Sequence, residues 1–320
     1  MDFNPSTNKK MMKKTTYEQS MLLGCKLYIS ESRNLAALDS IERAAALHQE
    51  IVIMDKFEDR VYNCVRYTLV SYVIHDSSTD SPIYSPLQQT VLAMVEAAYQ
   101  AINLEHHWGA HPTLGVVDDI CFHPLGREKL EEAAWLAKLV ARDISNQLQV
   151  PVFLYEAAHP TGKTLDAIRR DLGYFRPNYM GSQWAGWALP EVLNENPDEG
   201  PTLVPRSRGI VIIGASPWVR TFNVPIMSTD VSITRRIARK VSARGGGLPT
   251  VQAIGLVHGE DSTEIACYLL EPNRVGADHV QNQIGLLAAE EGLDVDKGYF
   301  TDYSPEMILE KYKKLVSTNQ

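Results

Sequence analysis

The sequence Trp108-Gly109-Ala110-His111-Pro112-Thr113-Leu114-Gly115 continues into Val116-Val117-Asp118-Asp119-Ile120 and places one histidine between glycines. Pro112 fixes its own φ and favours an extended backbone at His111, while the glycines permit a sharp turn and the close approach of a ligand. A histidine in this setting titrates near neutral pH. The stretch therefore predicts either an acid/base residue at His111 or a plain connector from a helix into a β-rich segment.

The segments on either side of this stretch alternate between strand and helix patterns. Apolar runs predict strands, and apolar residues at helical spacing predict helices. Before the stretch we expect strands at 21–30, 51–54 and 61–74, and helices at 34–48 and 86–104. After it we expect an extended segment at 113–122, helices at 127–148 and 164–172, and a strand at 152–155.

Residues 173–208 combine many Gly, Pro, Asn and Trp with no regular period, so we expect an irregular segment. A long loop inside a compact domain is usually functional or disordered, and Trp184 and Trp187 argue against disorder. A second set of patterns follows, with strands at 209–214, 219–225, 250–257 and 264–270 and helices at 229–242, 275–291 and 304–316.

Both sets of elements have the order expected for split β-α-β units. The sequence therefore predicts an α+β fold of two ferredoxin-like subdomains, at 21–216 and 217–320, with a ligand cleft between them. Residues 1–20 are polar and lysine-bearing with no apolar region behind them, so we expect a disordered tail rather than a secretory signal. An organellar transit peptide is the minor alternative for this tail.

The composition is that of an ordinary globular protein, with 44% hydrophobic and 22% charged residues. The net charge of −8 argues against a general nucleic-acid binder, and the apolar runs are too short to span a bilayer. The four cysteines are scattered, without zinc or redox spacing. We therefore expect a cytoplasmic protein that binds neither nucleic acid nor membrane.

Histidines near the opening stretch invite a metal interpretation. His107 and His111 have the spacing of two ligands on one helix face, but Gly109 and Pro112 break the helix that this geometry requires. Because no nearby Cys or Glu completes a set of ligands, we expect no metal.

Two acidic residues follow the histidine within the extended segment. In a regular strand Asp118 and Asp119 would point to opposite faces, so at most one of them can face His111. A carboxylate there can orient the imidazole or raise its pKa. The alternative is a solvated strand edge.

Residues 157–164, Ala-Ala-His-Pro-Thr-Gly-Lys-Thr, follow a predicted strand and open a predicted helix, as a phosphate-binding P-loop does. The first glycine of that motif is replaced by Ala157, and Pro160 removes one N–H from the anion cradle. We therefore expect a loop and a helix start. A nucleotide binder that uses Gly162-Lys163-Thr164 is a remote alternative.

Several short segments form a pattern through their order and spacing along the chain. They are Gly109-Ala110-His111-Pro112-Thr113-Leu114-Gly115, Val150-Pro151-Val152-Phe153-Leu154-Tyr155, Pro197-Asp198-Glu199-Gly200-Pro201, Val204-Pro205, Gly214-Ala215, Phe222-Asn223-Val224 and Val251-Gln252-Ala253-Ile254-Gly255. Together they resemble the formiminotransferase family, the folate-dependent transferase part of formiminotransferase-cyclodeaminase. The resemblance runs from about Leu22 to the C-terminus, and we expect no counterpart of the helical cyclodeaminase part.

The resemblance implies two α/β subdomains with folate in the cleft, commonly as a homodimer, and tetrahydrofolate as a co-substrate. It implies that His111 is the acid/base. We expect the one-carbon donor to contact Asn63, Asp118, Gly214 and Arg220. The resemblance also implies that a loop contributes to the folate site, through Gly200, Pro201, Thr202, Leu203, Val204, Pro205, Arg206 and Gly209.

The sequence departs from the family pattern next to these residues. Glu usually precedes the catalytic His and Arg follows two positions after it, whereas this chain has Ala110 and Thr113. The family's Asn-Arg reads Asn63-Cys64, and its Gly-Ala-Arg reads Gly214-Ala215-Ser216. Arginine is the natural partner of a carboxylated substrate such as formiminoglutamate. The arginines close enough in sequence to substitute are Arg66 and Arg220.

Together these observations predict a folate-binding one-carbon transferase that moves a formimino or related group to tetrahydrofolate. His111 would accept a proton from the attacking amine and donate one to the leaving amine. The alternative is a folate-binding protein without this activity. The expected partners are folate, a one-carbon donor and a second copy of the chain.

Overall fold

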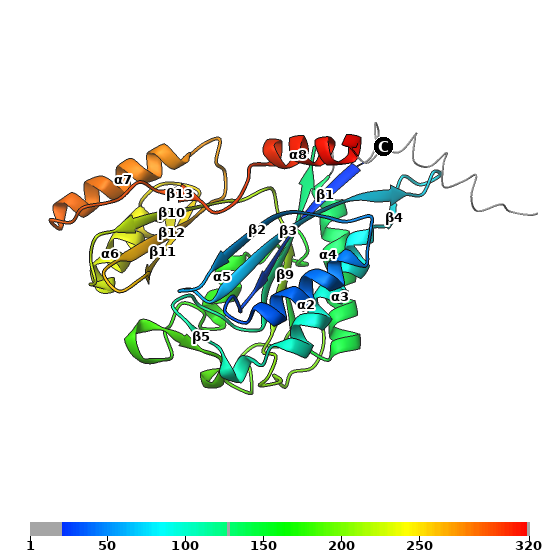
Figure 1. Ribbon diagram of the computed structural model, residues 1–320, viewed down its shortest axis with the longest axis horizontal. Helices are drawn as coiled ribbons and strands as arrows, with labels where there is room; N and C mark the ends of the chain where they lie inside the picture. The colour runs from blue at the N-terminus through cyan, green and yellow to red at the C-terminus, as the bar shows by residue number, and fades with distance from the viewer. Residues whose placement is uncertain (1–20, 127–128, 319–320) are drawn as a thin grey trace, which may run out of the picture.

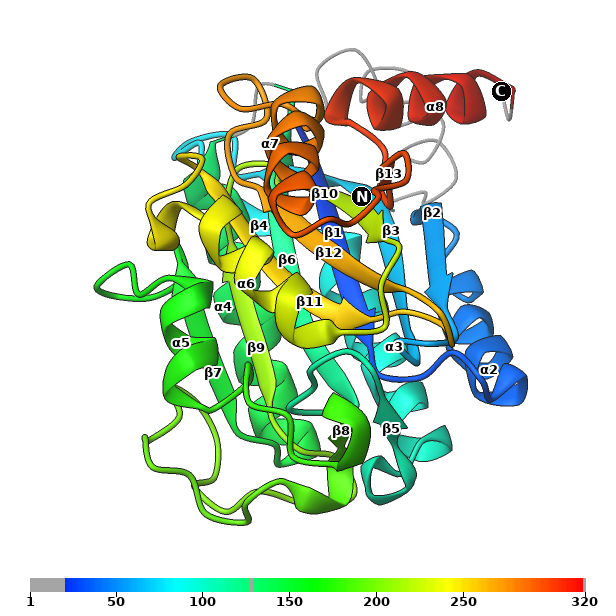
Figure 2. The same ribbon diagram turned by 90° about the vertical axis from the view of Figure 1, so that its left-hand side faces the viewer.

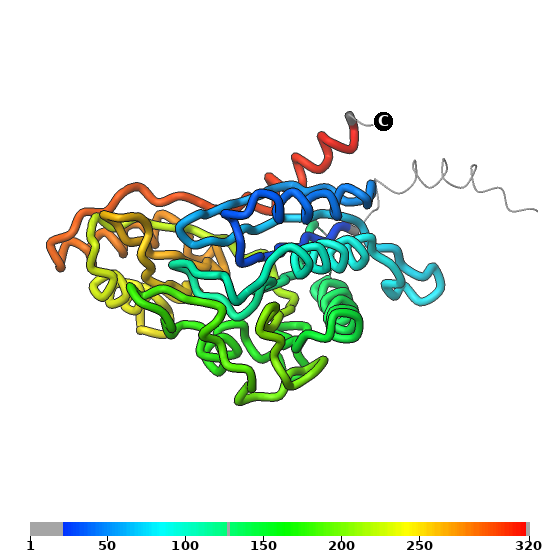
Figure 3. The backbone as a smooth tube through the Cα atoms, turned by 60° about the horizontal axis from the view of Figure 1, so that its bottom comes forward, coloured from blue at the N-terminus to red at the C-terminus, as the bar shows by residue number. Residues whose placement is uncertain are grey.

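The structure is a computed structural model that describes residues 21–126 and 129–318 and contains two main β-sheets with helices packed against them. The first half, blue to green, and the second half, yellow and orange, lie side by side (Figure 1, Figure 3). The mixed α+β class predicted from the sequence is confirmed. The predicted tail at 1–20 lies outside the described residues.

The first half is built on a sheet of seven strands in the order β2-β3-β1-β6-β9-β7, with β4 paired to β3. Neighbours from β2 to β6 are antiparallel, whereas β9 lies parallel to both β6 and β7. The strands are β1 Met21–Ile29, β2 Val52–Asp59, β3 Cys64–His75, β4 Pro82–Tyr84, β6 Val117–Leu125, β7 Val152–Glu156 and β9 Val211–Ala215.

Three helices cover one face of this sheet, and the other face packs partly against residues 168–210 and partly against the second half. In β1 the apolar Leu23, Leu27 and Ile29 are fully buried in the core that contains these helices. Because strand side chains alternate, the polar Lys26 and Tyr28 point to the opposite face. The helices are α2 Leu35–Ala46, α3 Pro86–Ala101 and α4 Leu130–Leu148.

The second half is an antiparallel sheet in the order β11-β12-β10-β13, with α6 and α7 on its outer side (Figure 2). Its core is separate from that of the first half and includes Val224, Ile265 and Ile284. The elements are β10 Arg220–Ile226, α6 Val231–Val241, β11 Val251–Val257, β12 Thr263–Leu269, α7 Ala277–Glu290 and β13 Tyr299–Phe300.

The last helix, α8 Pro305–Thr318, returns to the first half. Its Ile308 and Tyr312 pack with Val70 and Trp218 on the face of the large sheet that α2, α3 and α4 leave open. Figure 1 shows α8, in red, away from α7 and beside the strands of the first half.

The chain between α3 and β6 differs from the predicted helix end and extended segment. It forms a short 3₁₀ helix, η1 Leu104–His106, and a short strand, β5 Trp108–Gly109, before β6 begins. Earlier in the chain, β2 is longer than expected, and β3 begins at Cys64 because residues 60–63 form a turn. Asn63 has φ 54° in this turn, a left-handed conformation that asparagine tolerates.

Residues 173–208 have no long helix or strand, as predicted. Trp184 anchors this segment, since it is 2% exposed and its Nε1 donates to the carbonyl of Tyr174 at 2.9 Å. The short strand β8 of this segment, Trp184–Ala185, pairs with β5, which ends two residues before His111. The remaining short elements are α5 Leu165–Asp171, η2 Met180–Ser182, η3 Gly186–Ala188 and η4 Ala243–Gly245. Within the described ranges, the helices lack the length and apolar character needed to cross a bilayer.

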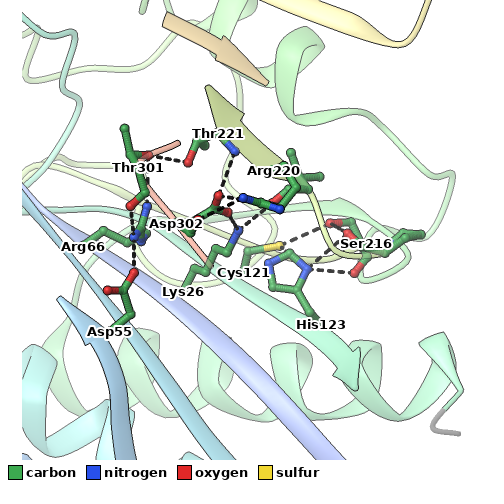
Figure 4. A network of polar contacts seen from close by, with 12 residues as sticks. Lys26, Asp55, Arg66, Cys121, His123, Ser216, Arg220, Thr221, Thr301 and Asp302 are labelled. Carbon is green, nitrogen blue, oxygen red and sulfur yellow. Dashed lines mark hydrogen bonds and ion pairs between the residues drawn. The ribbon is translucent and has the colours of Figure 1, made fainter. Parts of the chain in front are cut away.

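Charged side chains are buried where the two halves meet (Figure 4). Lys26 donates to Asp302 Oδ2 at 2.6 Å and to the carbonyl of Val219 at 2.6 Å, and Arg220 Nε donates to Asp302 Oδ1 at 2.9 Å. Burial alone would raise the pKa of Asp302, but the charges of Lys26 and Arg66 keep it below its usual value. The pairing is required because a buried charge without a partner is strongly destabilising.

Gly115 provides a test of the packing behind His111. A Cβ at this position would lie 2.0 Å from the carbonyl oxygen of Ile210, so we expect Gly115→Ala to lower the free energy of unfolding by about 1–3 kcal/mol. Urea unfolding followed by circular dichroism measures the change. Gly285→Ala is the control, because a Cβ there meets open space on α7 and should raise stability by up to about 1 kcal/mol. Equal stability of the two variants would contradict the close packing.

Candidate functional site

A cavity of about 640 Å³ lies between the two sheets and is lined also by α5, α6 and η4. Tyr28 and Arg66 line it from the first sheet, and Asn223, Gln252 and Tyr268 line it from the second. We call it the interface cavity. Its volume lies within the ~300–1,000 Å³ that is typical of small-molecule sites.

His111 lines the interface cavity, and the backbone before it determines its position. Gly109 lies against the 60–63 turn, where a Cβ would be 2.3 Å from the carbonyl oxygen of Tyr62. The N–H of Ala110 donates to the carbonyl of Val61 at 3.2 Å. The glycine therefore allows residues 109–115, which we call the histidine segment, to dock on this turn.

The imidazole of His111 has a defined tautomer. Its Nδ1 lies 2.8 Å from the carbonyl oxygen of Pro112. Because a carbonyl oxygen only accepts, Nδ1 carries the proton and Nε2 of the neutral ring keeps its lone pair. Burial lowers the pKa of His111, which favours this neutral form at pH 7. The residue is thereby set up as a proton acceptor.

His107 also lines the interface cavity but is arranged differently. It is 3% exposed, and burial lowers its pKa to about 4. The Nδ2 of Asn63 donates to its Nδ1 at 3.3 Å, so the lone pair of that nitrogen is already used. Asn63 itself lines the cavity and accepts from the N–H of Ser32 at 3.0 Å.

The expectation that Asp118 and Asp119 point to opposite faces is wrong. Tyr28 pairs with Asp119 and the next residue of β1 pairs with Val117, so Asp118 is the extra residue of a β-bulge. Both carboxylates consequently lie near one guanidinium, with Arg169 Nη2 at 3.5 Å from Asp118 Oδ2 and 3.7 Å from Asp119 Oδ2. Of the two, Asp118 lines the cavity.

These two carboxylates have different surroundings. Asp118 accepts from the N–H of Leu114 at 2.9 Å and from the hydroxyl of Tyr174 at 3.1 Å. Burial raises the pKa of Asp119 to about 6, although the charge of Arg169 opposes the rise. Asp118 is therefore the carboxylate that stabilises the histidine segment directly.

Arginine dominates the charge of the interface cavity. Six arginines line it, against the two carboxylates Asp118 and Asp166. Outside the lining, Asp55 pairs with Arg66 and Asp119 lies near Arg169, and the positive charge that remains in excess favours an anionic ligand. The six are Arg66, Arg169, Arg170, Arg235, Arg239 and Arg244.

Gly214 and Arg220 lie outside the lining of the interface cavity. Gly214 is in β9, where a Cβ would lie 2.5 Å from the ring of Tyr155, so this position is fixed by packing. Arg220 binds Asp302 and stacks over the ring of Phe300 at 3.8 Å. The structure brings neither residue to the site.

The loop from Gly200 to Gly209 also lies outside this lining. A Cβ at Gly209 would be 2.3 Å from the carbonyl oxygen of Leu114, so the loop supports the histidine segment from behind. Arg206 is on the surface, where it pairs with Glu105 at 3.1 Å and Glu191 at 2.6 Å. Direct folate contacts from this loop remain a prediction.

The Gly162-Lys163-Thr164 sequence forms a helix start rather than an anion cradle. Lys163 Nζ pairs with Asp171 at 2.8 Å and Glu195 at 2.7 Å, and Thr164 caps α5 by accepting from the N–H of Ala167. The nucleotide-binding alternative gains no support from this arrangement. In the parts of the chain that the structure describes, no group of three or more His, Cys, Asp or Glu side chains could hold a metal ion.

Sequence patterns did not reveal several side chains of the interface cavity. Arg169 is in a predicted helix, and Tyr62 in a predicted strand, but nothing in the local sequence distinguishes them from ordinary helix and strand residues. Gln252 and Tyr268 come from the second sheet. Only the docking of the two halves brings Gln252 and Tyr268 into the same cavity as His111.

Comparison with known proteins shows which family the sequence of this chain matches. Residues 22–216 match the family described as "Formiminotransferase domain, N-terminal subdomain". The chain is 49% identical over 301 residues to the "Formiminotransferase cyclodeaminase-like protein" of Arabidopsis thaliana, covering 94% of this chain and 99% of that protein.

More distant relatives have names that state an activity. The "Glutamate formimidoyltransferase" of Streptococcus pyogenes serotype M1 is 27% identical, over 74% of this chain and 73% of that protein. The "Formimidoyltransferase-cyclodeaminase" of Sus scrofa is 30% identical, over 74% of this chain and 41% of that protein. The match over 22–216 and the Arabidopsis relative together show that the chain belongs to the formiminotransferase family.

Proposed function

We propose that the chain transfers a formimino or related one-carbon group to tetrahydrofolate in the interface cavity, with His111 as the acid/base. The observation that carries this proposal is the position of the His111 imidazole at the cavity wall, with Nδ1 2.8 Å from the Pro112 carbonyl oxygen, which leaves Nε2 as the ring nitrogen that can accept a proton. The names of the relatives support the same reaction class.

In the proposed reaction His111 moves one proton twice. As the amine of tetrahydrofolate attacks the one-carbon carbon of the donor, Nε2 accepts the proton from that amine. The imidazolium then donates this proton to the nitrogen that leaves with the rest of the donor. Such positioned proton transfer typically contributes ~10²–10⁴-fold, and holding both substrates in one cavity contributes the rest.

The cavity lining fits the proposed ligands. Folate and an amino-acid donor both carry carboxylates, which the excess of arginine would bind. Tyr28 and Tyr268 provide aromatic surface from the two sheets. We propose that Asn63 and Asp118 contact the donor, and that the 200–209 loop acts by supporting the histidine segment.

We also propose that the two halves are ferredoxin-like subdomains at 21–216 and 217–320. The orders β2-β3-β1-β6 and β11-β12-β10-β13 support this, because in each set of four strands the first in the chain is in third place and the last of the four lies beside it. We also propose a homodimer, which the family resemblance implies, and a cytoplasmic location, which the scattered cysteines favour.

Thr113 favours a second candidate function, a folate-binding protein without formimino transfer. In place of the family's arginine, its hydroxyl bonds with that of Ser30 at 2.7 Å and donates to the carbonyl of Gly115 at 3.0 Å. Cys64, at another arginine position, lines the cavity. Tetrahydrofolate binding, followed by tryptophan fluorescence, without formimino transfer by the wild type would favour this candidate.

Replacing His111 tests the proposed acid/base. We expect His111→Ala to lower kcat for formimino transfer by about 10²–10⁴-fold, because the proton acceptor is lost. Tetrahydrofolate affinity, measured by fluorescence titration, should change little. His106→Ala is the control, since His106 is an exposed histidine of η1 close by in sequence. Wild-type turnover by His111→Ala would rule out its role.

The pH dependence of kcat/KM tests the state of the imidazole. A base works when it is neutral, and burial lowers the pKa of His111 below its ordinary 6.5. We therefore expect activity to persist as the pH falls through 6.5 and to be lost at lower pH. In Asp118→Asn this acidic limb should move lower still, because the carboxylate of Asp118 raises the pKa of His111. An acidic limb centred above 6.5 would contradict the assignment.

A further inference from the structure

Tyr62 lies in the 60–63 turn, between His111 of the first half and residues of the second half. We propose that Tyr62 is a positioning residue for His111 and that Glu264 of the second half holds it in place. The geometry would then make proton transfer at His111 depend on the docking of the second half. As a statement about catalysis, this inference rests on the proposed function.

Tyr62 is fixed at its backbone, and its ring contacts two imidazoles. Asp59 Oδ1 accepts from its N–H at 2.9 Å. Its ring centroid lies 5.4 Å from that of His111 and 4.9 Å from that of His258. His258 in turn bonds through Nε2 to Asp59 Oδ2 at 2.8 Å. The ring therefore packs against two imidazoles, of which the second is itself anchored.

Glu264 holds the hydroxyl end of Tyr62. This carboxylate is on β12 and is 0% exposed. Its Oε1 accepts from the Tyr62 hydroxyl at 2.6 Å and from Asn223 Nδ2 at 2.6 Å, and its Oε2 accepts from the Tyr299 hydroxyl at 2.7 Å. Hydrogen bonds to a charged acceptor are short and strong, so three of them leave the carboxylate little freedom. Glu264 is outside the cavity lining and reaches His111 through Tyr62.

His111 needs such support because Nε2 must stay available for the proton. The hydrogen bond that the structure gives its imidazole runs from Nδ1 to the adjacent Pro112 carbonyl. The tilt of the ring is then set by packing, with Tyr62 at 5.4 Å and Tyr174 at 6.3 Å in an edge contact. Tyr174 is held within the first half by Asp118. Tyr62 supplies the link to the second half.

The effect of the neighbouring charged groups on the pKa of His111 can be separated from the effect of the packing of the Tyr62 ring. Asp118 and Asp59 raise its pKa, Arg169 lowers it, and His107 is the neighbouring imidazole. Tyr62→Phe leaves all of these groups in place and removes one neutral hydroxyl. A change in the titration of His111 in this variant therefore reports its position and burial.

The test is a double-mutant cycle with Tyr62→Phe and His111→Ala. Because the free ring can shift from its working position, we expect Tyr62→Phe to lower kcat by about 10- to 100-fold and to leave KM for tetrahydrofolate within about twofold. In the His111→Ala background Tyr62→Phe should cause no further loss of kcat, because both substitutions act on the same proton transfer at His111. An equal loss in both backgrounds would overturn the proposal.

A second readout does not require activity. The imidazole of His111 can be titrated by NMR, and Tyr62→Phe should move its pKa up toward 6.5 as burial is relieved. A wild type without formimino transfer would refute the proposed function, while this titration would still test Tyr62. An unchanged titration would overturn the positioning role.

Two matched variants complete the design. Tyr72→Phe removes another hydroxyl bonded to a glutamate, Glu50, at 2.5 Å on the surface, and should leave both kcat and the His111 titration unchanged. Glu264→Gln keeps an oxygen for the Tyr62 hydroxyl but loses one acceptor, so its kcat should fall between those of wild type and Tyr62→Phe. A loss of kcat in Tyr72→Phe as large as in Tyr62→Phe would argue against a specific role.

Discussion

The close approach of backbone to backbone positions the candidate site. Gly109 and Gly115 flank His111, and a side chain at either glycine would overlap a carbonyl oxygen, that of Tyr62 on one side and that of Ile210 on the other. Only glycine lacks the Cβ that these contacts exclude. The histidine segment is therefore confined between a turn of the antiparallel part of the sheet and the start of a parallel strand. Its main chain, rather than flexible side chains, determines where His111 lies.

Local patterns predict the elements of this fold well and the contacts between them poorly. Residues of the main core alternate along β1, and buried residues recur at helical spacing along α2. These signals lie within a few residues, so the sequence contains them. The bulge at Asp118 depends on how β6 meets its neighbour, and periodicity does not record it. The bond from Tyr62 to Glu264 joins residues 202 positions apart. Arg169 likewise reaches the site only through tertiary packing.

Residues inferred from the family resemblance fall into two groups in the structure. His111, Asn63 and Asp118 line the interface cavity, whereas Gly214 and the 200–209 loop lie behind it. The glycines of the second group are explained by the backbone and rings packed against them. A match to a family motif can therefore reflect a requirement for shape rather than contact with a ligand, and geometry distinguishes the two.

The return of α8 to the first half affects how the interface cavity can open. The chain crosses into the second half after β9 and crosses back before α8, so the second half is tethered at both of its ends. Rotation about a single hinge would pull on the second tether and draw Ile308 and Tyr312 from the sheet on which they pack. Wide opening is thus thermodynamically linked to undocking of a helix far from His111, and a ligand that holds the halves together also stabilises that helix.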